Sequence, residues 1–270
     1  MTLTRSQVSA LLASHGLTPS KALGQHFLVD PNTARRIVRL AGVGPADRVL
    51  EVGPGLGSLT LALLDAGAHV TAVELDARLA SVVTEVTRGR CEVVVGDARE
   101  VDLIGLLGER PVRVVANLPY NVAVPIVVRL LEEAPSVRSL LVMVQTEVAE
   151  RLAAGPGSRT YGAVSVKVDY FATARVVGRV SRSVFFPEPN VDSSLVALGR
   201  RDAVAVDPDA VSADRLFEVV RAAFSHRRKM LRRSLEGVVA PEAFARAGVA
   251  PTQRPEELDV AAFGRLAATT

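Results

Sequence analysis

The stretch VLEVGPGLGSLT, residues 49–60, runs from a β-branched apolar segment through three glycines into a segment with helical periodicity. Gly53, Gly55 and Gly57 fall where a strand would turn into a helix. Glycine allows a tight turn and a close approach of the backbone to a ligand, and the first N–H groups of the following helix can bind that ligand. Many strand-to-helix turns contain glycine without binding anything, so this stretch alone predicts the turn.

Short β-branched runs alternate with helical segments from residue 48 onward, which is the pattern of a parallel sheet covered by helices. The predicted strands are 48–52, 69–75, 91–97, 112–118 and 139–145. The predicted helices lie near 57–66, 77–88, 100–107 and 121–133. Between 163 and 198 the runs AVSVKVDYF, ARVVGRV and SSLVALG suggest antiparallel strands at one edge of the sheet. The fold class predicted from these patterns is α/β.

Residues beyond about 200 have a helical composition, and DPDAVSAD (207–214) is typical of a linker or a helix start. Within 213–236 the apolar residues fall on one helical stripe, namely Phe217, Val220, Phe224, Leu231 and Leu235. We expect two domains: 1–199, which includes an N-terminal helix and the GQHFL segment, and a small all-α domain over 200–270.

Composition excludes several classes of protein. At 270 residues, with 49% apolar residues, the chain can bury a substantial core. The single cysteine, Cys91, has no partner for a disulfide or a metal cluster, so we expect a buried thiol and no metal. No window approaches the roughly 18 consecutive apolar residues of a membrane span, and MTLTRSQVSALLASHG lacks the features of a signal peptide. We expect a cytoplasmic protein without membrane association.

Basic residues cluster near the C-terminus. The net charge is only +3, but six Arg and Lys residues and no acid occur between Arg221 and Arg233. Such a block suggests a polyanionic partner, although charge runs are usually solvated faces of helices. The phosphate-binding candidates are Arg227, Arg228, Lys229, Arg232 and Arg233, and Arg151 and Arg159 are weaker ones.

Acidic residues follow the second and third predicted strands. Glu74 comes 21 positions after Gly53, where a carboxylate can accept hydrogen bonds from both hydroxyls of a ribose. Asp76 competes for that role but is also a good helix cap. Asp97 could accept a hydrogen bond from an adenine amino group, cap the next helix, or do both. This pattern predicts a nucleoside cofactor and does not choose between NAD and S-adenosylmethionine.

The fourth strand ends in VVANLPYNV, residues 114–122. An adenine amine is a poor nucleophile because its lone pair is delocalised, and it can attack a sulfonium methyl once its N–H groups are held by acceptors. Asn117 Oδ1 and the Leu118 carbonyl supply two acceptors, Pro119 fixes the turn, and Tyr120 offers a ring for stacking. The alternative is an ordinary turn without a function. The glycine turn, Glu74 and Asp97 at the ends of the three preceding strands disfavour that interpretation.

The motifs of the chain resemble those of a known family. The resemblance rests on KALGQHFL (21–28), EVGPGLG (51–57), VELD (73–76), GDA (96–98), ANLPYNV (116–122), YGAVSV (161–166), VFFPEPNVDSSLV (184–196) and AFSHRRKMLRRSL (223–235). These motifs are similar, in order, to those of the KsgA/RsmA rRNA adenine N6,N6-dimethyltransferases. The resemblance implies a Rossmann-like class I methyltransferase domain with a mostly parallel seven-stranded sheet, and a small helical RNA-binding domain.

The resemblance also implies the activity and the residues that carry it. The family uses S-adenosylmethionine to dimethylate two adjacent adenines in the 3′-terminal hairpin loop of 16S rRNA within a pre-30S particle. The implied cofactor contacts are His26, Leu28, Gly53, Glu74, Asp97 and Asn117. The implied surroundings of the reacting amine are Asn117, Leu118, Pro119, Tyr120 and Phe185, the last stacking on the base in preference to Phe186. Position 26 departs from the frequent Asn, and Lys21 and Gln25 lie in the same segment.

Three alternatives remain. The first is the related large-subunit adenine methyltransferase that confers antibiotic resistance; YGAVSV, the FFPEPNVDS segment and AFSHRRK argue against it. The second is an assembly factor without catalysis, which the intact NLPY segment disfavours. The third is an NAD-dependent dehydrogenase, for which no convincing acid is found. We expect a monomer, because RNA supplies the partner surface.

Overall fold

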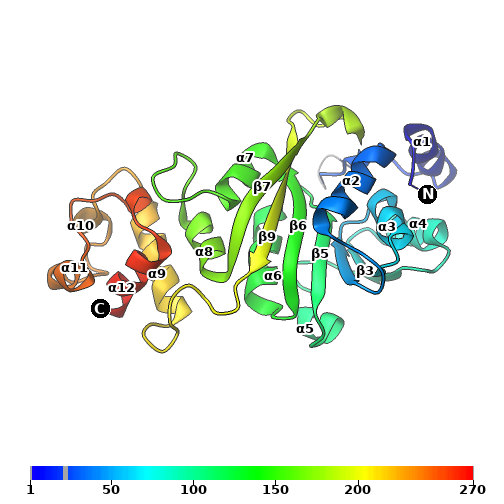
Figure 1. Cartoon of the computed structure of the whole chain (residues 1–270). Helices are drawn as coiled ribbons and strands as arrows, with labels where there is room; N and C mark the ends of the chain where they lie inside the picture. Colours follow the sequence, from blue (N-terminus) through cyan, green and yellow to red (C-terminus); the bar gives the residue numbers. More distant parts are fainter. Residues whose placement is uncertain (1, 21–23, 270) are drawn as a thin grey trace. The chain divides into compact units, whose positions relative to one another are not determined.

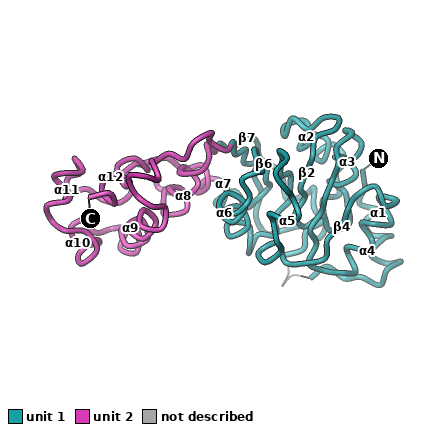
Figure 2. The backbone as a smooth tube through the Cα atoms, turned by 90° about the horizontal axis from the view of Figure 1, so that it is seen from below, with its two compact units in different colours: residues 1–149, 175–199 teal, residues 150–174, 200–270 magenta. Residues whose placement is uncertain are grey.

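The computed structural model describes residues 2–20 and 24–269 (Figure 1). The backbone divides into two compact units (Figure 2). The first unit holds Met1–Ala149 and Arg175–Gly199, and the second holds Glu150–Ala174 and Arg200–Thr270.

The first unit is built on a seven-stranded sheet in the order β4-β3-β2-β5-β6-β9-β7. Its strands are β2 (Arg48–Val52), β3 (His69–Glu74), β4 (Glu92–Val95), β5 (Val112–Asn117), β6 (Val137–Gln145), β7 (Ala172–Val180) and β9 (Ser193–Arg200). The helices of this unit are α1 (Arg5–Ser14), α2 (Pro31–Ala41), α3 (Ser58–Asp65), α4 (Ala77–Thr87), α5 (Leu103–Leu107) and α6 (Ala123–Glu133). Helix α7 (Thr146–Leu152) continues into the second unit. The five predicted strands and the four helices between them are confirmed.

The parallel core of the sheet follows from its sequence. Strands β2 to β6 pair in parallel, and four of the five residues of β2 are buried, as expected for strands covered on both faces. Helices α2 and α3 pack one apolar cluster against the sheet through Ile37, Leu59 and Leu63. Helix α2 packs on α3 and on β5 and β6, α3 and α4 pack on β3, and α6 packs on β6 with α5 beside it (Figure 1). The carboxyl ends of β2, β3 and β5 therefore share one edge, which is where parallel sheets bind ligands.

The prediction for residues 163–198 is partly wrong. β9 pairs antiparallel with β6, and β7 completes the edge. However, AVSVKVDYF forms helix α8 (Ala163–Phe171). Its valines alternate as in a strand, but Val166 and Tyr170, four residues apart, share a helical face that packs on Phe217, with the Tyr170 and Phe217 ring centroids 5.2 Å apart. Tertiary packing therefore outweighs the β-branched pattern.

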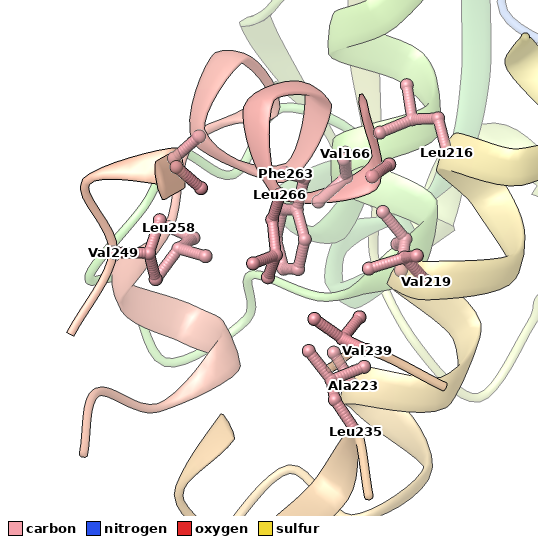
Figure 3. Packing of buried hydrophobic residues seen from close by; sticks show 14 of the residues in the cluster. Val166, Leu216, Val219, Ala223, Leu235, Val239, Val249, Leu258, Phe263 and Leu266 are labelled. Atoms are coloured by element: carbon pink, nitrogen blue, oxygen red, sulfur yellow. The ribbon is translucent and has the colours of Figure 1, made fainter. Parts of the chain in front are cut away.

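The second unit is helical. Besides α8 it contains α9 (Ala213–Ser225), α10 (Leu231–Ser234), α11 (Pro241–Ala247) and α12 (Val260–Ala268). Figure 3 shows the Phe263 ring among side chains of α9 and of the segments that follow it, including Val219, Ala223 and Leu235. The Tyr161 hydroxyl donates to the Leu258 carbonyl at 2.9 Å, which ties the start of the unit to its end.

The apolar stripe predicted within 213–236 is buried or half-buried, but it does not lie on one helix. Helix α9 ends at Ser225, residues 226–230 form a turn, and α10 begins at Leu231. Apart from Arg221, which lies on α9, the basic block consequently occupies a turn and a short helix rather than the faces of a long helix.

The division into units differs from the predicted domains in one segment. One break between the units falls between Gly199 and Arg200, and 150–174 groups with the C-terminal residues, whereas the sequence places it in the first domain. The reason is the packing of α8, whose Val166 and Tyr170 belong to the apolar cluster of the helical unit.

Candidate active site

The glycine turn joins β2 to α3 and is shaped by close packing. Gly55 has φ +62°, and a Cβ at this position would lie 2.9 Å from Phe27 Cδ1. Only glycine fits both the backbone conformation and the contact. Behind the turn, Ser58 Oγ donates to the Leu28 carbonyl at 2.6 Å, so the turn is held against the segment that contains the GQHFL motif.

A pocket opens where the glycine turn meets the ends of the strands. It encloses about 770 Å³ of space not filled by atoms, including the part open to solvent. Its lining includes these predicted residues: His26, Leu28, Gly53, Glu74, Asn117, Leu118, Pro119 and Tyr120. The structure thus brings together eight of the ten residues predicted to contact the cofactor or the reacting amine; Asp97 and Phe185 are not in the lining.

Glu74 stands at the end of β3 with only 6% of its surface exposed. Its Oε2 accepts from the Gly55 N–H at 3.0 Å and its Oε1 from the Asp76 N–H at 3.1 Å. Burial raises the pKa of Glu74, and the two backbone hydrogen bonds oppose that shift. Each oxygen retains a lone pair, so the carboxylate can accept two hydroxyl groups on the pocket side.

Asp76, the competitor for this role, caps α4. Its Oδ1 accepts from the Arg78 N–H at 2.9 Å, and its carboxylate pairs with the Arg78 guanidinium at 2.8 Å. Asp76 does not line the pocket, which favours Glu74 as the ribose-binding acid.

Asn117 is oriented by a long-range contact. Its Nδ2 donates to the His26 carbonyl at 3.2 Å, which leaves Oδ1 as the free acceptor of the side chain. Within the described residues no group donates to this oxygen. The Leu118 N–H donates to Met143 on β6 at 3.1 Å, so the turn that follows β5 is anchored to the sheet.

Tyr120 is fixed at both ends. Its hydroxyl is 2.7 Å from Ser193 Oγ, and its ring stacks on the His26 ring with centroids 5.6 Å apart. His26 Nδ1 is in turn 2.7 Å from the Pro187 carbonyl. The imidazole therefore supports the Tyr120 ring from one side, and Tyr120 lines the pocket. Gln25 also lines the pocket, and Lys21 lies outside the described residues.

Asp97 follows β4 but does not line the pocket. Its carboxylate is held by Arg99 at 2.6 Å, and the side-chain hydrogen bond from Arg99 is the main cause that lowers the pKa of Asp97. The group is therefore ionised and has a partner in this structure.

Phe185, predicted to stack on the base, does not line the pocket. It is completely buried in the cluster that contains Leu28 and Leu195, and its stacking role stays a prediction. The cause of the burial is a two-stranded ladder between β1 (Phe27–Leu28) and β8 (Phe185–Phe186), in which successive residues point to opposite sides. Phe186, on the other side, has the Arg5 guanidinium 5.7 Å from its ring centroid.

The structure adds an acid that the sequence reasoning missed. Glu51 lines the pocket, is 1% exposed, and its Oε2 has no hydrogen-bond partner within the described residues. Burial raises the pKa of Glu51 to about 8. Glu51 is therefore a mainly protonated carboxyl near neutral pH, and a cationic group bound in this pocket would favour its ionisation. The sequence offered one indication of this acid, because Glu51 is a charged residue inside the otherwise apolar end of the run RVLEV.

The basic block of the second unit is mostly exposed. Arg228, Lys229 and Arg232 are exposed. Arg233 faces Glu236 at 3.8 Å, and Arg227 faces Glu256 at 3.5 Å. Arg227 also donates to the Ser158 carbonyl, so part of its side chain serves the packing of its own unit. Arg151 and Arg159 are exposed as well.

Two classes of feature are not seen in the described part of the chain. No group of His, Cys, Asp or Glu side chains there could hold a metal ion. None of its helices is both long enough and apolar enough to cross a bilayer. Cys91 is buried.

The chain is similar to proteins of known activity. Residues 17–269 match the family described as Ribosomal RNA adenine dimethylase. "Ribosomal RNA small subunit methyltransferase A" of Leifsonia xyli is 52% identical, over 94% of this chain and 93% of the relative, and the protein of the same name from Thermobifida fusca is 50% identical, over 98% and 95%.

Solved structures of two methyltransferases are also similar to this chain. A dimethyladenosine transferase from Plasmodium falciparum superposes with a TM-score of 0.73 at 26% identity, covering 89% of this chain and 96% of the other. The 23S rRNA methyltransferase ErmE gives 0.70 at 28% identity, covering 90% and 98%. These similarities and the sheet order support the predicted Rossmann-like class I methyltransferase fold.

Proposed function

The chain belongs to the ribosomal RNA adenine dimethylase family, and we propose that it transfers methyl groups from S-adenosylmethionine to N6 of two adjacent adenines in the 3′-terminal hairpin loop of 16S rRNA. The observation that carries this proposal is the shared pocket: the glycine turn, Glu74 and the Asn117–Tyr120 segment line one cavity. A cofactor site and a base site that meet in one cavity are what methyl transfer to a nucleobase requires.

The residues present fit the cofactor. The glycine turn packs closely on Phe27 at Gly55, and Glu74 offers two acceptors for a ribose. Glu51 contributes a buried carboxyl whose Oε2 has no hydrogen-bond partner within the described residues. S-adenosylmethionine supplies a methyl group activated by a positively charged sulfonium. Leu28 and Gly53 lie in the same lining and are proposed to contact it through the backbone.

Asn117 is proposed to hold the attacking amine. Its Nδ2 is committed to the His26 carbonyl, so Oδ1 is available to accept an N–H of the adenine amino group. The Leu118 carbonyl is the second proposed acceptor, and Pro119 restricts the turn that presents it. Two acceptors on one amino group favour a pyramidal nitrogen whose lone pair points at the methyl group. No strong base is needed, because the cationic product of the attack loses its proton readily.

Tyr120 is proposed to stack on the extruded adenine. Stacking of a base on an aromatic ring contributes about 1–3 kcal/mol. His26 already covers one side of the phenol ring, and the bond to Ser193 fixes its rotation, so little ordering is left to do when the base enters.

The second unit is proposed to hold the RNA backbone. Arg228, Lys229 and Arg232 are exposed, so they can neutralise phosphates, with Arg227 and Arg233 contributing from their ion pairs. We further propose that the protein acts as a monomer, in the cytoplasm, on a pre-30S particle.

Methylation of isolated particles tests the proposal. Purified protein is incubated with labelled S-adenosylmethionine and with 30S particles that lack the dimethyladenosines, and in parallel with 23S rRNA. We expect label on two adjacent adenines of 16S rRNA. The similarity to ErmE makes 23S rRNA the second candidate, and label confined to 23S rRNA would reject our proposal. Binding to 30S particles without any transfer would indicate an assembly factor instead.

A further inference from the structure

The carboxylate of Asp97 is fully engaged by one neighbour. Oδ1 accepts from the Arg99 N–H at 2.8 Å and from Nε at 3.0 Å, and Oδ2 accepts from Nη2 at 2.6 Å and Nε at 3.1 Å. A carboxylate has about four lone-pair sites, and these contacts use both oxygens in the bidentate geometry that is strongest for arginine. Any other donor must share or displace them.

The backbone that carries Asp97 cannot easily move away from Arg99. The Gly96 N–H donates to the Glu74 carbonyl at 2.9 Å, and the Val101 N–H to the Asp97 carbonyl at 3.0 Å. From α6, Arg129 donates to the carbonyls of Ala98 at 2.8 Å and Val101 at 2.7 Å. The loop is thus tied to β3 and to α6, and the half-exposed Arg99 side chain is the part that is free to swing.

Asp97 nevertheless stands close to the cofactor pocket. In the sheet register Glu74 is the partner of Val95, two residues before Asp97, and Glu74 lines the pocket. The Asp97 carboxylate is therefore near the cavity, but it is paired with Arg99.

We propose that Arg99 competes with the adenine amino group of the cofactor for the Asp97 carboxylate and thereby weakens nucleoside binding. This inference rests on the proposed function and on the expectation from the sequence that Asp97 accepts a hydrogen bond from that amino group. When the nucleoside binds, its amino group must share an oxygen with Arg99 or displace one of these contacts. The competition acts equally on S-adenosylmethionine and on its product, because both carry the same adenine, so Arg99 also keeps the product from remaining bound.

The chain provides a matched control for this idea. Arg78 pairs with Asp76 at the same spacing of two residues, with the same N–H contact and a guanidinium contact at 2.8 Å. Asp76 caps α4 and does not line the pocket. Arg78→Met and Arg99→Met therefore remove the same charge and the same kind of ion pair, but only the second frees a carboxylate that the cofactor is proposed to use.

Calorimetry with S-adenosylhomocysteine measures the effect on the full-length protein. An exposed ion pair is worth up to about 1 kcal/mol, so Arg99→Met should tighten binding about threefold. Arg78→Met should leave binding unchanged. The gain should be absent with S-inosylhomocysteine, in which an oxygen replaces the amino group. Both variants alter exposed side chains, and thermal unfolding checks that they fold.

Three results would overturn the inference: unchanged or weaker binding in Arg99→Met, an equal gain in Arg78→Met, or an equal gain with the inosine analogue. The first would mean that Arg99 orients Asp97, and the other two would indicate a general effect of charge. Failure of the wild-type protein to bind S-adenosylhomocysteine would instead reject the proposed function, and with it this inference.

Discussion

Replacing Asn117 by alanine tests the proposed chemistry most directly. The substitution removes the Oδ1 acceptor, and the loss of one well-placed hydrogen bond to a reacting group costs about 1–3 kcal/mol, equivalent to about 5- to 150-fold in rate. It also removes the bond from Nδ2 to the His26 carbonyl, which positions the GQHFL segment. We therefore expect turnover to fall at least about tenfold.

The stability effect of Asn117→Ala is small enough to be separated from the catalytic effect. One hydrogen bond contributes about 1 kcal/mol to the free energy of unfolding. In a protein of this size that lowers the melting temperature by only about 2–4 °C. Assays far below the melting temperature then report on chemistry. Asn32→Ala, an exposed asparagine on α2 outside the pocket lining, serves as the control and should retain wild-type turnover.

Single-turnover methylation of 30S particles, with labelled S-adenosylmethionine at several concentrations, is the appropriate assay for Asn117→Ala. We expect the maximal rate to fall while the cofactor and the RNA still bind. Wild-type turnover would refute the role of Asn117. So would a defect that disappears at saturating cofactor, because the residue would then act only in binding.

Three further predictions address other parts of the molecule. Tyr120→Phe keeps the ring and loses the Ser193 contact, so its turnover should stay within about threefold of wild type, whereas Tyr120→Ala should raise the RNA KM about five- to 100-fold through lost stacking. Burial raises the pKa of Glu51 from 4.5 to about 8, so the folded protein keeps a proton that the unfolded chain releases. The free energy of unfolding should therefore fall as pH rises from about 4.5 to 8. Glu51→Gln should flatten this decline in denaturant titrations at several pH values, and an unchanged dependence of the free energy on pH would contradict the raised pKa of Glu51. Replacing Arg228, Lys229 and Arg232 together by Gln should reduce the slope of log affinity against log salt by about 2–3 in filter binding, without changing cofactor affinity; an unchanged slope would exclude phosphate contacts at these positions.

Local sequence patterns were sufficient for the parallel part of the sheet. Apolar, β-branched runs bounded by glycine and polar residues predict β2 to β6 within a few residues, because a strand buried on both faces needs continuous apolar side chains. Parallel strands place their carboxyl ends at one edge, so the order of the strands along the chain is enough to assign Gly53, Glu74 and Asn117 to one pocket.

The same patterns failed where distant segments decide the outcome. AVSVKVDYF alternates like a strand, yet its packing against α9 makes it a helix. The sequence favours Phe185 over Phe186 for stacking on the base, but it does not show which ring is buried; the ladder with Phe27 and Leu28 determines that.

The sequence by itself determined the fold class, the family and the positions of the strand-end residues, because these depend on local periodicity and on motifs of adjacent residues. Only the tertiary structure decided that Asn117 presents its oxygen, since the orientation comes from a hydrogen bond to His26, 91 residues away. It alone revealed that Glu51 lines the pocket with an Oε2 that finds no hydrogen-bond partner in the described part of the chain. Side-chain orientation, burial and pairing depend on which groups the fold brings together, and no local pattern contains that information.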